Sequence, residues 1–482
     1  MNRLFKVTYL GLVAGLIIAL VSPAFSTSFN GLAEKPLYDK LESALSRYLE
    51  VSEFKGQTEA QAFAEKNNII IENGNLYCAL KLRRGYTTED LPISEFPIYG
   101  VKIDSKSRNF IEVWIPQKNI VKFAHSLPQI SQIARPQKAI NLVTSEALSL
   151  FGARGFHDED VRGEGVRVGI IDGGFAGWVD LQEDGELPEF NYVNYSQEDM
   201  NEGSGHGAAC FEVVADVAPN AEYTLFKVWT GSHLERALDY ALANQIDLTS
   251  MSVGWELPDG DYFRGNDRLS QSVNEAFDNG LFMVQSAGNS AHAHYRSDFN
   301  DNGEEDHFYR YNDGGTINPI GASPDDFQSL PRGTMLNISL IWDDFPDTDQ
   351  DFDLELVMVT DGEAEVVATS DSRQNGNDDP TEQIRYVVES RGDFGVRVIR
   401  YDAENGMDFT IVGYPYDLGY HTAAGSMTVP SMAERCFAVG AVNYRDWDDR
   451  NPDIAYYSSQ GPSYDGRIKP NVVAPDGVST VV

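Results

Sequence analysis

Three polar residues near the middle of the chain have side chains that together could catalyse acyl transfer. Asp172 follows the apolar run Val166–Ile171, His206 opens a helix-like segment, and Asn289 follows the strand-like run Leu281–Ala287. A carboxylate can orient an imidazole, an imidazole can move a proton, and an amide can donate to a developing oxyanion. An acid, a base and an amide donor in this order therefore indicate an acyl-transfer site.

Alternating strands and helices are expected to position these three side chains. Strand-like runs alternate with helix-like segments from residue 146 onward, and these runs lie at 166–171, 221–228, 246–252, 281–287, 437–442 and 471–474. This alternation predicts a parallel sheet with helices on both faces, and ligands of such sheets bind at the carboxyl ends of the strands. Asp172 and Asn289 both fall at such ends.

One helix of this unit carries a recognisable start signal. Ser232 stands three residues before Glu235, and Leu234, Ala237 and Leu238 begin an apolar stripe with helical spacing. Serine followed by glutamate at this interval predicts a capping box, in which each side chain bonds to the other residue's backbone N–H.

The chain divides into five segments by composition. Arg3 and Lys6 precede an apolar run that ends near small residues around Ser26, which predicts a signal peptide at 1–26 and a secreted protein; an uncleaved anchor is the alternative. Residues 27–145 form a small α/β unit. The parallel sheet takes 146–295, and 296–413 contain short strands separated by acidic loops, which predict an inserted antiparallel β-sandwich. The parallel sheet then continues over 414–482.

Composition excludes several kinds of partner. The net charge of −37 repels nucleic acid and anionic lipid, so neither is expected to bind, and no membrane association is expected once a signal peptide has been removed. Three scattered cysteines are too few for a disulfide framework. Cys210 lies one helical turn beyond His206, where a small buried apolar residue is the ordinary interpretation.

The motifs, taken together, resemble those of the subtilisin-like serine peptidases, or subtilases. The matching residues are Asp172, the Gly-His-Gly at His206, Ser252-Val253-Gly254, Ala287-Gly288-Asn289, Ser458–Pro462 and Val473–Gly477. The resemblance implies that Asp172 orients His206, that Asn289 donates to the oxyanion, and that Ser252, Val253 and Gly254 bind substrate. It also implies proteins or peptides as substrates and a pro-region at 27–145 that inhibits the enzyme; an ordinary N-terminal domain is the alternative.

The family's nucleophilic serine has no counterpart in the 482 residues. It lies in a Gly-Thr-Ser segment shortly after the stretch that reads Val473–Thr480 here, and no Gly-Thr-Ser occurs in the chain. Ser426 stands four residues before Pro430, but it precedes the strand at 437–442 and so lies at the wrong place. Two interpretations follow: a partial chain of a secreted serine endopeptidase, inactive as given, or a subtilase-like pseudoenzyme that serves as an extracellular binding or scaffold protein.

A segment at the start of the predicted sandwich has the oxygen spacing of half a calcium loop. Its candidate ligands are Asp298, Asn300, Asn302 and Asp306. Carboxylate and amide oxygens suit Ca²⁺, but Tyr309 stands where an EF-hand has its final glutamate. The segment is either a structural calcium site or a solvated loop.

Overall fold

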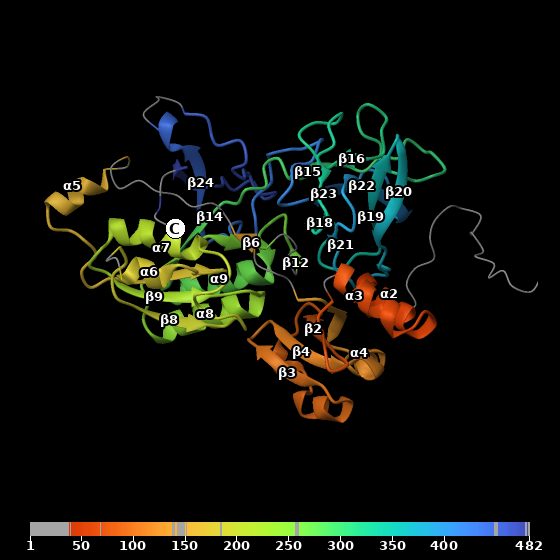
Figure 1. The fold of residues 1–482 in the computed structure, drawn as a ribbon, viewed down its shortest axis with the longest axis horizontal. Helices are drawn as coiled ribbons and strands as arrows, with labels where there is room; N and C mark the ends of the chain where they lie inside the picture. The colour runs from red at the N-terminus through yellow and green to blue at the C-terminus, as the bar shows by residue number, and fades with distance from the viewer. Residues whose placement is uncertain are drawn as a thin grey trace, which may run out of the picture.

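The computed structural model describes residues 38–480 except 39, 68, 137–139, 142–149, 151, 184–185, 256–259, 448–451 and 478–479. The predicted signal peptide at 1–26 lies outside this range. Three units are visible in Figure 1: an N-terminal unit below, a unit with a parallel sheet on the left, and a β-sandwich on the right. None of the described helices has the length and apolar character needed to cross a membrane.

The N-terminal unit is an antiparallel sheet covered by helices. Its strands run in the order β1-β2-β4-β3, with β5 beside β2. Leu45, Tyr48, Phe123 and the alternating residues of β4 form its core. The elements are α2 (Ser43–Phe54), α3 (Gln57–Lys66), β1 (Ile71–Glu72), β2 (Asn75–Leu82), β3 (Lys102–Lys106), β4 (Ile111–Pro116), α4 (Ile120–Ser126) and β5 (Ile130–Ala134).

The central unit is a seven-stranded sheet in the order β25-β24-β14-β10-β7-β9-β8, parallel throughout. This confirms the predicted α/β fold. Its strands are β7 (Arg167–Asp172), β8 (Phe190–Asn194), β9 (Glu222–Lys227), β10 (Leu248–Met251), β14 (Phe282–Ser286), β24 (Phe437–Asn443) and β25 (Val472–Asp476). The helices are α5 (Ala153–Asp158), α6 (Trp178–Glu183), α7 (His206–Val217), α8 (Gly231–Ala243) and α9 (Arg268–Asp278).

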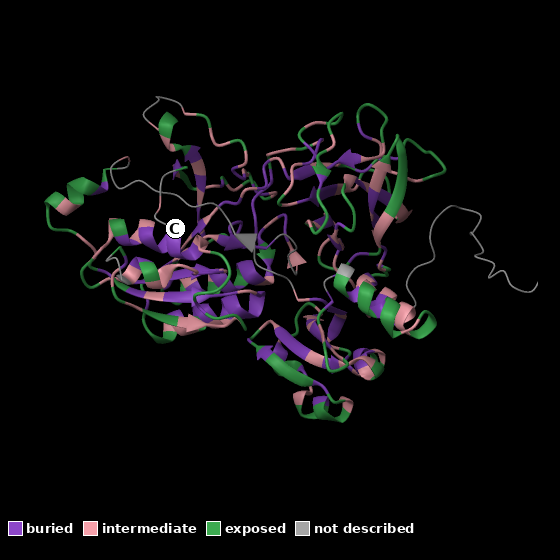
Figure 2. Cartoon of the chain, viewed as in Figure 1, coloured by how far each residue is buried: buried purple, intermediate pink, exposed green. Residues whose placement is uncertain are grey.

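Alternation along β7 divides the core between two faces of this sheet. Val168 and Ile170 pack with residues of α7, whereas Ile171 packs with residues of α8 and α9. Successive strand residues point to opposite faces, so a strand with helices on both sides must be apolar at nearly every position. The apolar run in the sequence has this cause, and Figure 2 shows most of the strands in the middle of this sheet in the colour of buried residues.

The inserted β-sandwich consists of two antiparallel sheets. One has the order β15-β23-β18-β21 and the other β16-β22-β19-β20, with β17 also on β22. The strands are β15 (His294–Asp298), β16 (Asn318–Pro319), β17 (Ser329–Leu330), β18 (Met335–Trp342), β19 (Asp351–Thr360), β20 (Glu363–Ser370), β21 (Thr381–Val387), β22 (Gly392–Asp402) and β23 (Asp408–Val412). The chain leaves the parallel sheet after β14 and returns to it at β24, the neighbouring strand.

Candidate active site

Asp172 is the last residue of β7 and is fully buried. Its Oδ1 accepts from the backbone N–H groups of Gly173 and Gly174 at 2.8 and 3.4 Å. Its Oδ2 lies 2.8 Å from Nδ1 of His206. Backbone donors hold the carboxylate in one orientation, so the remaining oxygen faces the imidazole.

His206 is the first residue of α7, and a close backbone approach brings it to Asp172. The N–H of Gly207 donates to the carbonyl of Gly174 at 2.8 Å. A Cβ on Gly207 would lie 2.6 Å from Cβ of Asp172 and 2.6 Å from the Gly174 oxygen. Only glycine fits between the helix start and the strand end. The second glycine of the Gly-His-Gly motif therefore sets the distance between the imidazole and the carboxylate.

Two opposing influences, burial and the neighbouring carboxylate, set the pKa of the His206 imidazole. Burial acts to lower the pKa of His206, but the Asp172 carboxylate outweighs burial and raises that pKa. The His206 side chain is 14% exposed, while that of Asp172 is not exposed at all. The pair thus places a partly buried, proton-binding imidazole over a fully buried carboxylate, as a general base requires.

Cys210 lies one turn after His206 on α7, and its Sγ is 3.9 and 4.0 Å from the two ring nitrogens. Among the described residues, Asp172, His206 and Cys210 form the one group whose ligand atoms are close enough together to hold a metal ion. The Asp172 contact already occupies Nδ1 of His206, and the thiol is buried. The sequence interpretation of Cys210 as a small buried residue fits its position.

Asn289 follows the carboxyl end of β14, which is separated from β7 by β10 alone. Neighbouring strands lie about 4.8 Å apart, so the ends of β14 and β7 are about 10 Å apart. Ser252 follows β10, and Val253–Gly254 form the short strand β11. All the predicted catalytic and substrate-binding residues therefore lie at the carboxyl edge of one sheet.

A segment of the N-terminal region is paired with this edge. Strand β6 (Ile140–Asn141) runs antiparallel to β11, with Asn141 opposite Val253 and Ile140 opposite Gly254. Backbone pairing to a short strand is how extended peptides are commonly recognised. The predicted substrate-binding strand is thus occupied by a segment of the same chain.

Ser426 has its hydroxyl engaged elsewhere. Its Oγ donates to the carbonyl of Ala423 at 2.6 Å and accepts from the N–H of Gln460 at 3.0 Å. The described hydrogen bonds of the His206 ring go to Asp172 and Cys210. Ser426 therefore stabilises a loop, in keeping with its position in the sequence.

The four candidate calcium ligands lie around an exposed loop. Asn300 accepts from the N–H of Asn302 at 2.9 Å, and Asp306 forms an ion pair with Arg310 at 2.6 Å. Asp298 is also exposed. An arginine on one of the carboxylates and side chains that face solvent fit a calcium site poorly, because the ion needs several oxygens directed at one point. Calcium binding stays a prediction.

Lys227 is a residue of this region that sequence reasoning missed. It lies directly opposite Asp172 in the β7–β9 pairing and is fully buried. Its ammonium donates to the carbonyls of Asp199 and Glu202 at 2.6 and 2.9 Å, in the loop that leads to His206. The available signal was a single lysine in the otherwise apolar stretch Leu225–Val228.

The predicted capping box on α8 is wrong. Thr230 is the N-cap and accepts from the N–H of His233. Glu235 instead accepts from Ser107, from the backbone and side chain of Asn109 in the N-terminal unit, and from Ser272 of α9. A tertiary contact has replaced the local one, which no local pattern reveals.

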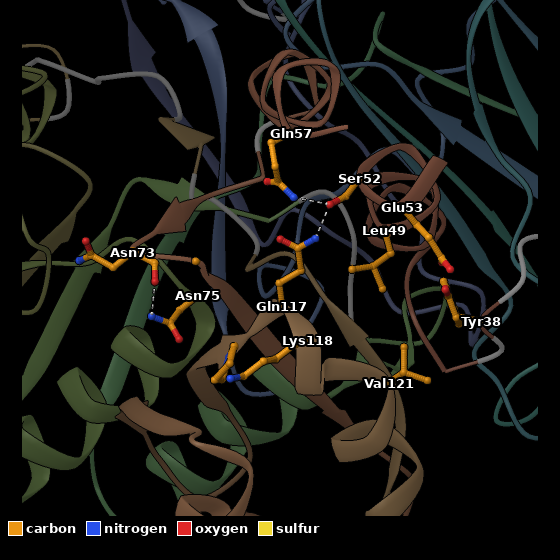
Figure 3. A pocket seen from close by; sticks show the side chains of 12 residues that line it. Tyr38, Leu49, Ser52, Glu53, Gln57, Asn73, Asn75, Gln117, Lys118 and Val121 are labelled. Atoms are coloured by element: carbon orange, nitrogen blue, oxygen red, sulfur yellow. Dashed lines mark hydrogen bonds between the residues drawn. The ribbon is translucent and has the colours of Figure 1, made fainter. Parts of the chain in front are cut away.

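A large pocket lies away from these residues, in the N-terminal unit. It has a volume of about 820 Å³ and includes Tyr38, Ser52, Gln57 and Gln117 in its lining. Figure 3 shows that Gln57 and Gln117 both point to Ser52, to which they donate at 3.0 and 2.5 Å. None of the predicted catalytic residues lines it.

The central unit is similar in sequence to known proteins and to one protein family. Residues 163–320 match the family model described as the subtilase family. An alkaline protease of Alkalihalobacillus alcalophilus is 24% identical over 298 residues, covering 58% of this chain and 69% of that protein. Subtilisin DY of Bacillus licheniformis is 30% identical over 145 residues, covering 27% and 49%.

Among solved structures, the CspB protease of Clostridium perfringens aligns with a TM-score of 0.42 and 14% identity, covering 68% of this chain and 79% of that one. The family match and the protease relatives identify the central unit as subtilisin-like and the chain as related to serine peptidases.

Proposed function

We propose that this subtilisin-like chain is a secreted serine endopeptidase in which Asp172, His206 and Asn289 serve one reaction centre. The observation that carries the proposal is the 2.8 Å contact between Nδ1 of His206 and Oδ2 of Asp172 at the carboxyl edge of a parallel sheet. A serine hydroxyl is a weak nucleophile near neutral pH and needs a base to take its proton. His206 would take this proton and then give it to the leaving amine.

Asp172 and Asn289 would stabilise charges that develop during the reaction. Asp172 would hold the imidazole in the correct tautomer and stabilise it when it becomes charged. The amide of Asn289 would donate to the oxyanion of the tetrahedral intermediate. Loss of one such donor costs about 3 kcal/mol of transition-state stabilisation, a figure that comes from subtilisin itself.

We propose that Ser252, Val253 and Gly254 bind the substrate backbone. The antiparallel pairing of β6 with β11 supports this, because an extended peptide would add to β11 in the same way. The N-terminal unit would then act as an inhibitory pro-region, since β6 covers the strand that a substrate needs. Cleavage beyond Asn141 would release the mature enzyme, and the predicted signal peptide would direct its secretion.

A fluorophosphonate probe tests the proposal, because it labels activated serines covalently. Residues 1–482 contain no Gly-Thr-Ser, so the probe should be applied both to this chain and to the product of the complete reading frame of its gene. We expect the second to be labelled and to cut casein. His206→Ala should abolish both results, whereas His125→Ala, which changes an exposed histidine of α4, should not.

The alternative is a pseudoenzyme that acts as an extracellular binding or scaffold protein. The engagement of the Ser426 hydroxyl in a loop favours it. A complete reading frame that ends without a serine segment, together with the absence of labelling, would support this alternative and contradict the peptidase.

A further inference from the structure

The inserted β-sandwich is fixed to the central unit. Arg264 of the central unit contacts both oxygens of Asp343 at 2.7 and 3.0 Å, and the hydroxyl of Tyr464 donates to Asp408 at 2.8 Å. Ile341 of β18 is fully buried in the cluster that also contains residues of α8 and α9. Polar contacts and shared apolar packing therefore give the sandwich one position on the sheet.

The same sandwich contacts the N-terminal unit at α2. Nη2 of Arg47 lies 2.8 Å from the carboxylate of Asp371, whose side chain is 2% exposed. Ser43, the first residue of α2, shares a hydrogen bond of 2.8 Å with Ser372 and accepts from the N–H of Asp371 at 3.1 Å. In Figure 1, α2 and α3 lie next to the end of the sandwich that carries β20 and β21.

A further contact fixes the chain at the point where it leaves the N-terminal unit, just after β5. Arg135 is buried just beyond β5, and its guanidinium pairs with Glu42, whose carboxylate also accepts from the backbone N–H of Arg135 at 2.8 Å. Burial alone would raise the pKa of Glu42, but Arg135 and Arg385 lower it to about 2. Arg385 of β21 donates to the carbonyl of Pro136 at 2.6 Å. The sandwich thus holds the chain at the residue after Arg135.

Geometry connects this contact to the substrate-binding strand. Pro136 precedes Ile140 of β6 by four residues, so the two lie at most about 14 Å apart. Fixing Pro136 on a rigid surface limits the positions that Ile140 and Asn141 can occupy, and it lowers the entropic cost of their pairing with β11.

We infer that the β-sandwich is a second docking surface for the N-terminal unit, beside α8 and α9, and that Arg385, by holding Pro136, positions the β6 segment (Ile140–Asn141) on β11. The function of that segment as an inhibitor rests on the proposed peptidase function, whereas the docking itself does not. Arg385 is a positioning residue, because it acts on β11 through the chain that it holds.

Hydrogen–deuterium exchange on the full 482-residue chain tests this inference. Arg385→Gln removes the charged donor to Pro136, and we expect exchange in peptides containing Ile140 and Asn141 to become about tenfold faster. Arg385→Lys should recover part of the protection. Arg391→Gln is the matched control, since Arg391 is an exposed arginine of the same sandwich. It should leave exchange at 140–141 unchanged.

Exchange in β7 and β22 reports whether each variant is folded. Unchanged exchange at 140–141 in folded Arg385→Gln overturns the inference. If that variant unfolds the sandwich, Asp371→Asn is measured instead: faster exchange in α2 and at 140–141 supports docking, and unchanged exchange in both overturns it. A protein that shows the Arg385 effect but never cleaves a peptide contradicts the peptidase proposal alone, because exchange requires no catalysis.

Discussion

Two aspartates, Asp172 in the central unit and Asp301 in the sandwich, are both fully buried and have different partners. Asp301 accepts from Arg400 at 2.6 and 3.0 Å, from the N–H of Gly303 at 2.9 Å and from Asn405 at 3.0 Å, and Nδ1 of His307 lies farther away, at 3.4 Å. Asp172 has two backbone donors and one imidazole.

The nearest side-chain partner, arginine for Asp301 and histidine for Asp172, distinguishes a structural carboxylate from one suited to catalysis. An arginine keeps its charge at every accessible pH, so Asp301 and Arg400 form a permanent ion pair that ties a loop to β22. A histidine can gain and lose a proton, so the Asp172–His206 pair can take part in a reaction. Burial of a carboxylate is common to both sites and decides nothing by itself.

The largest expected effect separates these two roles. Asp172→Asn should lower kcat of the complete reading-frame product by about 10⁴-fold, because an amide favours the wrong tautomer of His206. Asp301→Asn should change kcat by less than about threefold. Kinetics on a peptide substrate measure both, with Asp278→Asn as the control at an exposed position. An equal loss of kcat in the two variants at constant stability would remove the distinction.

For the free energy of unfolding the order should be reversed, with the larger effect in Asp301→Asn. Asp301→Asn leaves the Arg400 guanidinium without its counter-charge and should cost about 3 kcal/mol of unfolding free energy, at the lower end for a buried pair because Arg400 is partly exposed. Urea unfolding of the 482-residue chain followed by near-UV circular dichroism would measure it. A loss below that of Asp278→Asn would show that the Asp301 network contributes little.

The pH dependence of the two sites should run in opposite directions. The pKa of Asp301 is lowered in the folded state, because Arg400 and its hydrogen bonds overcome burial, so its contribution to stability is lost as pH falls below about 4. The pKa of His206 is raised, so its contribution is present below about 6.5 and is lost as pH rises into the alkaline range.

Activity should therefore rise toward alkaline pH, since His206 must lose its proton before it can act as a base. NMR titration of the imidazole provides the measurement. In Asp172→Asn the pKa of His206 should fall, because burial still lowers it and the carboxylate, the larger of the influences that raise it, is gone. A pKa that stays raised in this variant would contradict the assignment of Asp172 as its cause.

The smallest expected effect concerns calcium. Because Arg310 pairs with Asp306 and Asp301 is bonded by protein groups, EDTA should shift the midpoint of thermal unfolding by no more than about 2 °C. Differential scanning calorimetry with and without added Ca²⁺ measures this. A large shift, lost in Asp298→Asn but not in Asp278→Asn, would establish the calcium site that the sequence spacing suggests.

Local patterns predicted what depends on neighbouring residues. The apolar run before Asp172, the helix after His206 and the β-rich insertion are each encoded by periodicity, and the structure has them as β7, α7 and the sandwich. Local patterns did not predict the contacts between segments that are distant in the sequence. Glu235 binds Asn109 of another unit, Lys227 binds a loop that closes over it, and Arg385 holds Pro136. Each of these contacts joins residues that no local periodic pattern in the sequence relates to each other.

The way in which the sandwich joins the sheet has a consequence for protein engineering. The chain enters through β15 and leaves through β23, which pair with each other, and the N–H of Gly413 donates to the carbonyl of Ala293 at 2.8 Å. The two attachment points are thus neighbours, like the ends of a hairpin. A short turn could bridge them, so the module could be exchanged as a cassette, provided that the replacement fills the place of Ile341 in the central core and gives Arg264 a new partner.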